Sequence, residues 1–215
     1  MQEKRAKWKE LNLKAEHDNL VFLDESGVNI NMIRRYGRAI GKARVHCSVP
    51  LNTPPTQTVL SSVRLNGQTT YTMYSGGTTG KRFLDYLKNV LIPTLNRGDI
   101  VVMDNMRSHH VTGVKEALRA AGVIPLYLPP YSPDLNPIEM MWSKMKSVLR
   151  KIGCRTAALL PQVVVKALSL VSASDCVGWF AADGTGFLKR AVMIVVVVKN
   201  AVNMTASLAN SPQFM

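Results

Sequence analysis

Residues 131–146 read YSPDLNPIEMMWSKMK, and the change of pattern inside this stretch decides how the rest of the chain is arranged. The first half contains Pro, Asp and Asn, which resist regular structure or favour turns. The second half has apolar residues at helical spacing, namely Ile138, Met141, Trp142, Met145, Val148, Leu149 and Ile152. The stretch therefore predicts a rigid loop that leads into an amphipathic helix packed against the domain.

This helix would carry one acid, Glu139, in its first turn. Asn136 suits the N-cap position and Pro137 the first helical position. A Glu three residues after an N-cap is also where a capping-box residue sits, reaching back to a backbone N–H. Taken alone, the position of Glu139 fits either capping or chemistry.

The composition indicates a globular, strongly basic protein. The 215 residues are 47% hydrophobic and 19% charged, and the formal net charge is +13. A polyanionic partner is expected, with nucleic acid as the first candidate and an anionic membrane surface as the second. The three cysteines are far apart, which favours neither a disulfide framework nor a zinc ribbon and fits a reducing, intracellular compartment. No apolar signal segment or membrane-length apolar run is present, so a soluble protein is expected.

Two further acids follow predicted strands. The apolar run 21–23 ends on Asp24, and the run 99–103 ends on Asp104. A helix of about 112–121 and a strand at 123–128 come next, and this β-α-β order suggests parallel strands. Because parallel neighbours end at the same edge of a sheet, we expect Asp24 and Asp104 to lie close together there.

The remaining elements complete an α/β domain. A hairpin is predicted from strands 58–65 and 69–74, with a turn at Asn66 and Gly67. A helix is predicted around 81–91 and is stopped by Pro93; a single further helix begins at Ala157. Residues 1–19 are a lead-in segment, 20–184 the domain, and 185–215 an atypical tail. The tail contains AVMIVVVV and no acid, and is read either as a read-through or disordered segment or as an added edge strand.

Three carboxylates in one place repel one another, and divalent cations relieve that repulsion. Hard oxygen ligands suit Mg²⁺ or Mn²⁺, and two such ions about 3.5–4 Å apart support phosphodiester chemistry. A basic protein with such a centre is suited to DNA cleavage. Asp134 is an alternative third acid, although a Pro-bounded turn already favours Asp there. A zinc site of His109, His110 and a cysteine has no supporting spacing.

The chain also resembles a known family in three stretches, VFLDESGVN (21–29), GDIVVMDNMRSHH (98–110) and LPPYSPDLNPIEMMWSKMK (128–146). They are similar to the acid-bearing blocks of DDE transposases, most closely the insertion sequence 630 group of the mariner superfamily. The 34 residues between Asp104 and Glu139 are similar to that group's spacing. The resemblance runs from about Leu20 to Asp183, and the third block is the most specific.

This resemblance implies an RNase H-like fold, with a mixed five-stranded sheet flanked by helices. It implies that Asp24, Asp104 and Glu139 are the catalytic triad, holding Mg²⁺ or Mn²⁺ as two ions. The implied reaction is metal-dependent DNA cleavage followed by strand transfer, without a covalent protein–DNA intermediate. The implied partners are transposon ends, target DNA and a second copy of the chain, in the bacterial cytoplasm with the nucleoid. No membrane partner is implied.

Further residues are candidates for ligand orientation or DNA contact. Asn105 and His109 match positions in the family's second block and are candidates to orient ligands or contact DNA. The basic run after Asn31 and the basic positions after Glu139 are candidates to contact phosphates, which singles out Arg34, Arg35, Arg38, Lys144, Lys146 and Arg150. Trp142 and Met145 are assigned to the core by their spacing.

The chain departs from the family at its N-terminus. Only about twenty residues precede Asp24, so the helix-turn-helix modules that precede this domain in the family are missing. A truncated transposase is expected, with a separately encoded N-terminal half as a candidate partner. The alternatives are a catalytically idle, sequence-nonspecific DNA-binding remnant and, on the tail alone, a membrane-surface protein.

Overall fold

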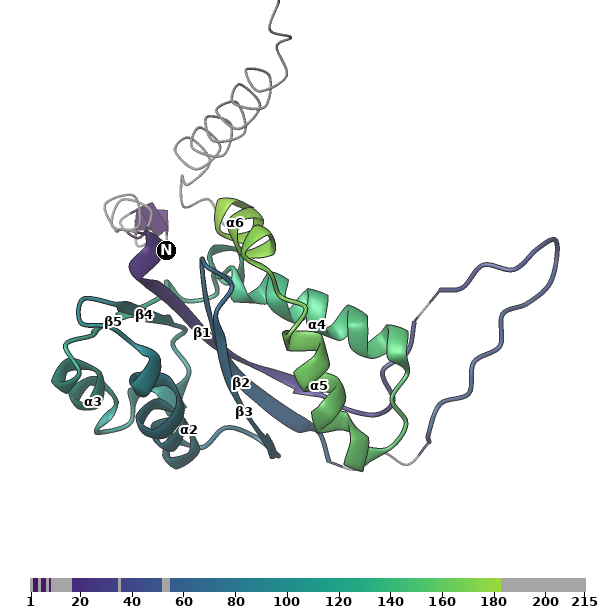
Figure 1. The fold of residues 1–215 in the computed structure, drawn as a ribbon, viewed down its shortest axis with the longest axis horizontal. Coiled ribbons are helices and arrows are strands. Elements are labelled where there is room, and N and C mark those ends of the chain that lie inside the picture. The colour runs from purple at the N-terminus through teal and green to yellow at the C-terminus, as the bar shows by residue number, and fades with distance from the viewer. Residues whose placement is uncertain are drawn as a thin grey trace, which may run out of the picture.

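A mixed sheet of five strands, in the order β3-β2-β1-β4-β5, forms the centre of the domain (Figure 1). This computed structural model describes residues 2–3, 5–6, 8, 17–34, 36–51 and 55–182. The strands are β1 (Leu20–Val28), β2 (Gln57–Arg64), β3 (Thr69–Ser75), β4 (Ile100–Met103) and β5 (Ile124–Tyr127). Strand β2 is antiparallel to both of its neighbours, β1 and β3, whereas β1, β4 and β5 run parallel to one another. The predicted mixed five-stranded sheet is confirmed.

Strand β1 is longer than its apolar run predicts. It continues past Asp24 to Val28, so the prediction that the strand ends at Asp24 is wrong. The reason is that β2 pairs with β1 along its whole length from Val21 to Val28, whereas β4 pairs only with residues 20–22. Asp24 nevertheless lies just beyond the point where the parallel pairing with β4 ends.

The two predicted supersecondary units are confirmed. In the β2–β3 hairpin, Gly67 has a φ of 88°, which favours glycine, and the Gln68 amide donates to Asn66 Oδ1 at 2.9 Å. In the second unit, α3 (Val114–Ala120) connects the parallel strands β4 and β5.

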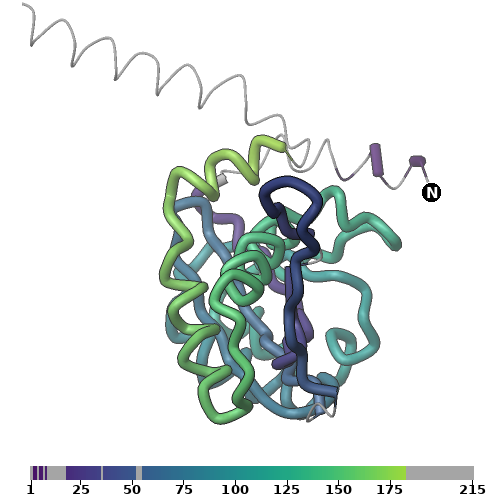
Figure 2. The backbone as a smooth tube through the Cα atoms, turned by 90° about the vertical axis from the view of Figure 1, so that its right-hand side faces the viewer, coloured from purple at the N-terminus to yellow at the C-terminus, as the bar shows by residue number. Residues whose placement is uncertain are grey.

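Helices cover both faces of the sheet (Figures 1 and 2). One face carries α3 and α2 (Gly80–Tyr86), and the other carries α4 (Ile138–Ile152), α5 (Leu160–Leu168) and α6 (Ala173–Ala182). The helix predicted around 81–91 consists of α2 and the π-helical η2 (Leu87–Leu91), and the 3-10 turn η3 (Ile92–Thr94) extends it past Pro93. Further 3-10 turns are η1 (His17–Asn19), η4 (Arg107–His110), η5 (Pro133–Leu135) and η6 (Ala157–Leu159).

The prediction of a single helix from Ala157 is wrong, because α5 ends at Leu168 and a separate helix, α6, begins at Ala173. Ser172 caps the new helix: the Asp175 amide donates to Ser172 Oγ at 3.2 Å, and the Ser172 amide donates to Asp175 Oδ2 at 2.9 Å. This reciprocal capping box starts a second helix.

In the part of the chain that the structure describes, no single helix has both the length and the composition needed to cross a membrane. Only the pair 157–168 and 173–182, bent by 79°, meets the two criteria together. The predicted tail, residues 185–215, and Arg35 lie outside the described residues.

Alternate residues of β1 supply the two hydrophobic cores. Leu20 and Phe22 belong to the core beneath α4, α5 and α6, and Val21 and Leu23 to the core beneath α2 and α3. The same alternation sends the next two side chains, Asp24 and Glu25, to opposite faces of the sheet.

Candidate active site

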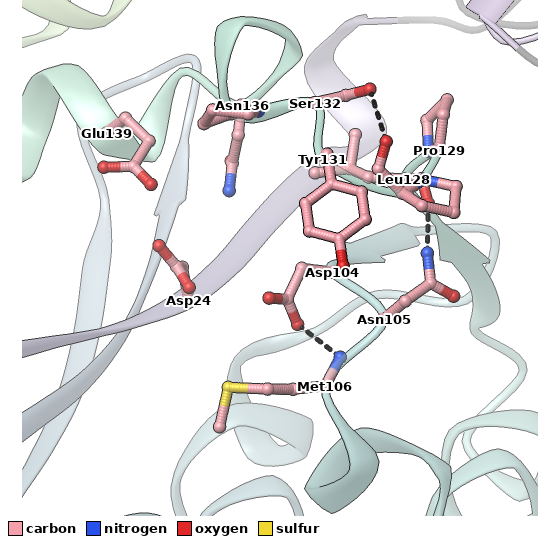
Figure 3. A pocket seen from close by; sticks show the side chains of 12 residues that line it. Asp24, Asp104, Asn105, Met106, Leu128, Pro129, Tyr131, Ser132, Asn136 and Glu139 are labelled. Atoms are coloured by element: carbon pink, nitrogen blue, oxygen red, sulfur yellow. Dashed lines mark hydrogen bonds between the residues drawn. The ribbon is translucent and has the colours of Figure 1, made fainter. Parts of the chain in front are cut away.

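Asp24, Asp104 and Glu139 line one cavity of about 470 Å³ at the edge of the sheet (Figure 3). Asp24 comes from β1, Asp104 follows β4, and Glu139 lies in the first turn of α4. The other lining residues are Asn105, Met106, Leu128, Pro129, Pro130, Tyr131, Ser132, Pro133 and Asn136. Among these described lining residues none is Lys, Arg or His, so the cavity concentrates negative charge inside a basic protein.

Asp24 is fixed from the α4 side of the sheet. Trp142 Nε1 donates a hydrogen bond to Asp24 Oδ2 at 3.1 Å. Burial raises the pKa of Asp24 to about 7, and the charges of Glu25 and Glu139 act in the same direction. Figure 3 shows the carboxylates of Asp24 and Glu139 pointing toward one another.

Asp104 is fixed from the opposite side, by His109. His109 Nδ1 lies 2.7 Å from Asp104 Oδ1, and its Nε2 lies 3.1 Å from Glu25 Oε1. Burial alone would lower the pKa of His109, but the hydrogen bonds to Asp104 and Glu25 raise it to about 10. The imidazolium therefore donates from both nitrogens and connects Asp104 to β1, and its ring stacks on Phe83 at 4.1 Å between centroids.

The same contacts set the charge of Asp104. Partial burial raises its pKa, but the hydrogen bonds from His109 and from the Met106 amide, the latter at 2.9 Å, outweigh it and hold the pKa below the ordinary value. Asp104 is therefore ionised at neutral pH, while Asp24 is close to its midpoint. The two aspartates differ because only Asp104 has a cationic partner.

Glu139 does not cap α4. The N-cap residue is Pro137, and in the described part of the chain no side chain caps this helix. The predicted N-cap role of Asn136 is therefore wrong, as is the capping-box alternative for Glu139. The turn η5 delivers the chain to Pro137 with a φ of −61° and a ψ of −20°, so the helical conformation begins without a side-chain cap.

The structure supports neither Asp134 as the third acid nor a zinc site at His109 and His110. Asp134 does not line the cavity and forms an ion pair with Arg5. Within the described residues, no three His, Cys, Asp or Glu side chains are placed to hold a metal ion, which removes the zinc alternative.

That finding also covers the triad, so the acids share a cavity without forming a closed metal cage. The donor set nevertheless fits Mg²⁺ or Mn²⁺, because all three side chains are carboxylates with hard oxygens, and burial destabilises the charge of one of them, Asp24. Mg²⁺ commonly uses one or two carboxylates together with water and substrate phosphates. Asp24, Asp104 and Glu139 are the residues that would hold it.

The other predicted site residues are dispersed. The Asn105 amide donates to the Leu128 carbonyl and so connects the loop after β4 to the end of β5. Lys144, a predicted phosphate contact, pairs with Asp175 at 2.5 Å, so its charge is partly neutralised within the protein. Lys146 and Arg150 are partly exposed on α4. Arg34 and Arg38 are exposed in the β1–β2 loop (residues 29–56), which extends outward from the sheet (Figure 1).

Two residues near the acids were not identified from the sequence. Glu25 follows Asp24 directly, but its role depends on His109, which comes from another element. Trp142 was assigned to the core and is indeed only 2% exposed, yet its indole N–H also reaches Asp24. A buried Trp usually places its N–H on an acceptor, and that was the available signal.

Comparison with known proteins agrees with this geometry. The family described as "DDE superfamily endonuclease" matches residues 19–157. No curated protein matches the chain. Similar solved structures are a pre-cleavage Mos1 transpososome (17% identity, TM-score 0.70) and the Mos1 mariner paired-end complex with Mn (18%, 0.70); each match covers 87% of this chain and 60% of that chain. The Mos1 catalytic domain alone matches at 18% identity and a TM-score of 0.55, over 85% of this chain and 93% of that chain.

At these identities the structural likeness shows the fold, which is the RNase H-like fold expected from the sequence. The chain spans about 60% of the length of the first two Mos1 chains that it matches. The family match covers most of the described domain, including all three acids of the cavity. The chain therefore belongs to the DDE superfamily endonucleases, with the fold of a mariner transposase catalytic domain.

Proposed function

We propose that this domain cleaves and joins DNA strands in transposition, with Asp24, Asp104 and Glu139 as the catalytic acids. The observation that carries the proposal is their placement around one cavity by three separate elements, in a chain of the DDE endonuclease family. The net charge of +13 supports a polyanionic substrate.

The reaction is phosphodiester hydrolysis, which leaves a 3′-hydroxyl and a 5′-phosphate. That 3′-hydroxyl then attacks a second phosphodiester, exchanging one P–O bond for another, so no covalent protein–DNA bond is required. Bound Mg²⁺ or Mn²⁺, as two ions, would supply charge stabilisation and a more acidic bound water or hydroxyl. One of the similar structures is a complex with Mn, which supports this choice of cofactor.

The protein's own residues prepare the cavity for that chemistry. Trp142 orients Asp24, and His109 orients Asp104 while compensating its charge. Glu139 enters from a helix anchored by five buried side chains, Ile138, Met141, Trp142, Met145 and Leu149. Packing on both faces of β1 therefore holds the acids in place before DNA arrives.

The proposed partners are transposon ends and target DNA, on which two copies of the chain act together inside the cell. The similar structures include a paired-end complex and a pre-cleavage transpososome of Mos1, which supports this assembly. A separately encoded N-terminal half that recognises transposon ends is part of the proposal.

The decisive experiment is the nicking of supercoiled plasmid by the wild-type chain and by Asp104→Asn. Wild-type protein should produce nicked circles with Mg²⁺ or Mn²⁺ and none with EDTA, and Asp104→Asn should produce none because a charged ligand is removed. Undiminished nicking by Asp104→Asn would remove this residue from the site. Retarded DNA without any nicked product from the wild-type protein would instead indicate the catalytically idle DNA-binding remnant.

A further inference from the structure

We propose that Asn136 is a further substrate-contacting residue, whose side-chain amide donates a hydrogen bond to a non-bridging oxygen of the DNA phosphodiester in the cavity. The inference rests on the proposed function and adds to it a neutral phosphate-binding group. The three acids could not play this part while they hold a cation, because an ionised carboxylate and a phosphate are both hydrogen-bond acceptors.

The position of the Asn136 side chain is unusual. The residue is only 5% exposed and lines the cavity, and its Oδ1 is buried without a hydrogen-bond partner among the described residues. It does not cap α4, which is the role its sequence position predicts. In Figure 3 its nitrogen points into the space beside Asp24 and Glu139. Burying the Oδ1 acceptor without a donor is unfavourable, so this carboxamide is not placed there to satisfy the fold, and its N–H groups face the cavity.

The backbone around Asn136 is fixed. Its N–H donates to the Pro133 carbonyl at 3.0 Å, and its own carbonyl accepts from the Glu139 N–H at 3.1 Å. The loop and the first turn of α4 therefore fix the point from which the side chain enters the cavity, and its burial restricts the directions that it can take. A pre-oriented donor of this kind can stabilise the charge that develops on phosphate oxygens.

The other neutral side-chain donors of the cavity are engaged in hydrogen bonds or are exposed to solvent. The Asn105 amide is committed to the Leu128 carbonyl, and the Ser132 hydroxyl donates to the Pro130 carbonyl at 3.2 Å. Tyr131 also lines the cavity, but its side chain is 90% exposed, so packing does not fix its hydroxyl. Because no Lys, Arg or His is among the described lining residues, Asn136 is the best-placed donor for a phosphate next to the acids.

The test compares three variants with the wild-type chain. Asn136→Leu removes the donor at similar size, and Asn136→Asp replaces the donor by a charged acceptor. Asn89→Asp is the matched control, since it makes the same chemical change at an exposed position of η2 outside the cavity. The measurements are plasmid nicking with Mn²⁺, Mn²⁺ affinity by calorimetry, unfolding temperature, and affinity for a 30-base-pair duplex in Ca²⁺ by fluorescence anisotropy.

Asn136→Leu should slow nicking about a hundredfold and weaken duplex binding about tenfold. Its Mn²⁺ affinity should equal that of the wild type, and its unfolding temperature should be equal or higher because an unsatisfied amide is removed. Asn136→Asp should lose nicking at least as completely, and Asn89→Asp should nick like the wild type.

Three outcomes would overturn the inference. Asn136→Asp that nicks like the wild type would mean that the oxygen, not the N–H, is used. Equal reductions of Mn²⁺ affinity and nicking in both variants would mean that the carboxamide supports the acids. Equal duplex affinities of wild type and Asn136→Leu would exclude a DNA contact. Failure of the proposed function is distinct, because the wild type would then give no nicked product while the duplex affinities still decide the role of Asn136.

Discussion

At the scale of single residues, two neighbours in the chain, Asp24 and Glu25, have different surroundings. Asp24 lies on the α4 side, where Trp142 holds it, and Glu25 lies on the α2 side, where it accepts from His109. Because His109 also bonds Asp104, both aspartates are positioned relative to the same strand. The cavity is therefore braced from both faces of the sheet.

The hydrogen bond from Trp142 can be tested separately from its packing. Trp142→Phe keeps most of the apolar volume and removes the N–H, so stability should fall by about 1–2 kcal/mol. Nicking should fall by about tenfold, since Asp24 loses its only side-chain hydrogen-bond donor among those described. Plasmid nicking and thermal unfolding measure the two effects. Trp179→Phe in α6 is the control, and equal reductions of nicking in the two variants would refute the role assigned to Trp142.

The sequence predicted the three acids of the cavity but not the side chains that hold them. Each acid lies in or after an apolar strand or in the first turn of a helix, and such positions can be predicted from the neighbouring residues in the sequence. Their partners cannot, because Trp142 lies 118 residues from Asp24 and His109 lies 84 residues from Glu25 in the chain. Asn136 illustrates the opposite case: local pattern assigned it a cap that tertiary structure does not use.

At the scale of secondary-structure elements, a buried ion pair joins β2 to the start of β4. Arg64 bonds Asp99 through both of its terminal nitrogens, and the Asn96 amide donates to Asp99 Oδ2 at 2.6 Å. The side chains are only 7% and 2% exposed. The pair crosses the N-terminal end of β1, which is the end opposite to the cavity. It therefore fixes the position of the antiparallel strand β2 relative to the parallel strand β4.

Breaking this pair should strongly destabilise the sheet. Asp99→Asn leaves the Arg64 charge buried and unpaired, and we expect the free energy of unfolding to fall by about 3–5 kcal/mol. Adding Arg64→Met should recover part of that stability, because the uncompensated charge is removed. Urea unfolding of both variants measures the free energies. If Asp99→Asn alone lowered the stability by less than about 1 kcal/mol, the pair would not contribute as described.

A second ion pair, Lys144 with Asp175, joins α4 to α6 and should make stability depend on acid pH. The Lys144 hydrogen bond, followed by that of Ser172, lowers the pKa of Asp175 to about 2. Since the folded pKa is depressed, the stabilisation is present above the unfolded value near 3.9 and is lost as pH falls from about 4 to 2. With side chains 32% and 26% exposed, we expect about 1 kcal/mol.

Lys144→Met is the appropriate comparison for this pair. Urea unfolding at pH 5, 4, 3 and 2 should show a shallower decline for the variant than for the wild type, with a residual slope from Ser172. Parallel curves would contradict the assignment, because the pair would then contribute nothing to the pH dependence.

Most elements could be predicted from the sequence because their apolar periodicity is strong. The apolar stripe of α4 is buried as expected at Ile138, Met141, Trp142, Met145 and Leu149, whereas Ile152 is 45% exposed. The extension of β1 to Val28 could not be predicted, since it depends on pairing with β2. The start of α6, in contrast, could have been predicted from the sequence, because Ser172 and Asp175 have capping-box spacing.

At the scale of the whole molecule, an acidic cavity lies in a protein of net charge +13. The β1–β2 loop adds exposed cations at a distance from the acids, including Arg34 and Arg38. Such a distribution draws DNA toward the protein while leaving the cavity free for cations.

DNA binding should therefore weaken with salt and show little sequence preference. Anisotropy measurements between 50 and 200 mM KCl should give a linear decrease of log affinity with log salt concentration. Arg34→Ser and Arg38→Ser should each reduce the slope by about 0.9, because one phosphate fewer is neutralised by the protein. Asp104→Asn should leave the slope unchanged. An unaltered slope in the Arg34→Ser, Arg38→Ser double variant would exclude the loop from DNA binding.

The packing of α4 on β1 also sets an order of events during synthesis. The sheet's five strands are complete at Tyr127, whereas Glu139 and Trp142 belong to a later helix. A nascent chain can thus pair its strands while the third acid is still within the ribosome. A partly made product therefore cannot bring all three carboxylates of the proposed active site together, and the site is completed only after the sheet that supports it.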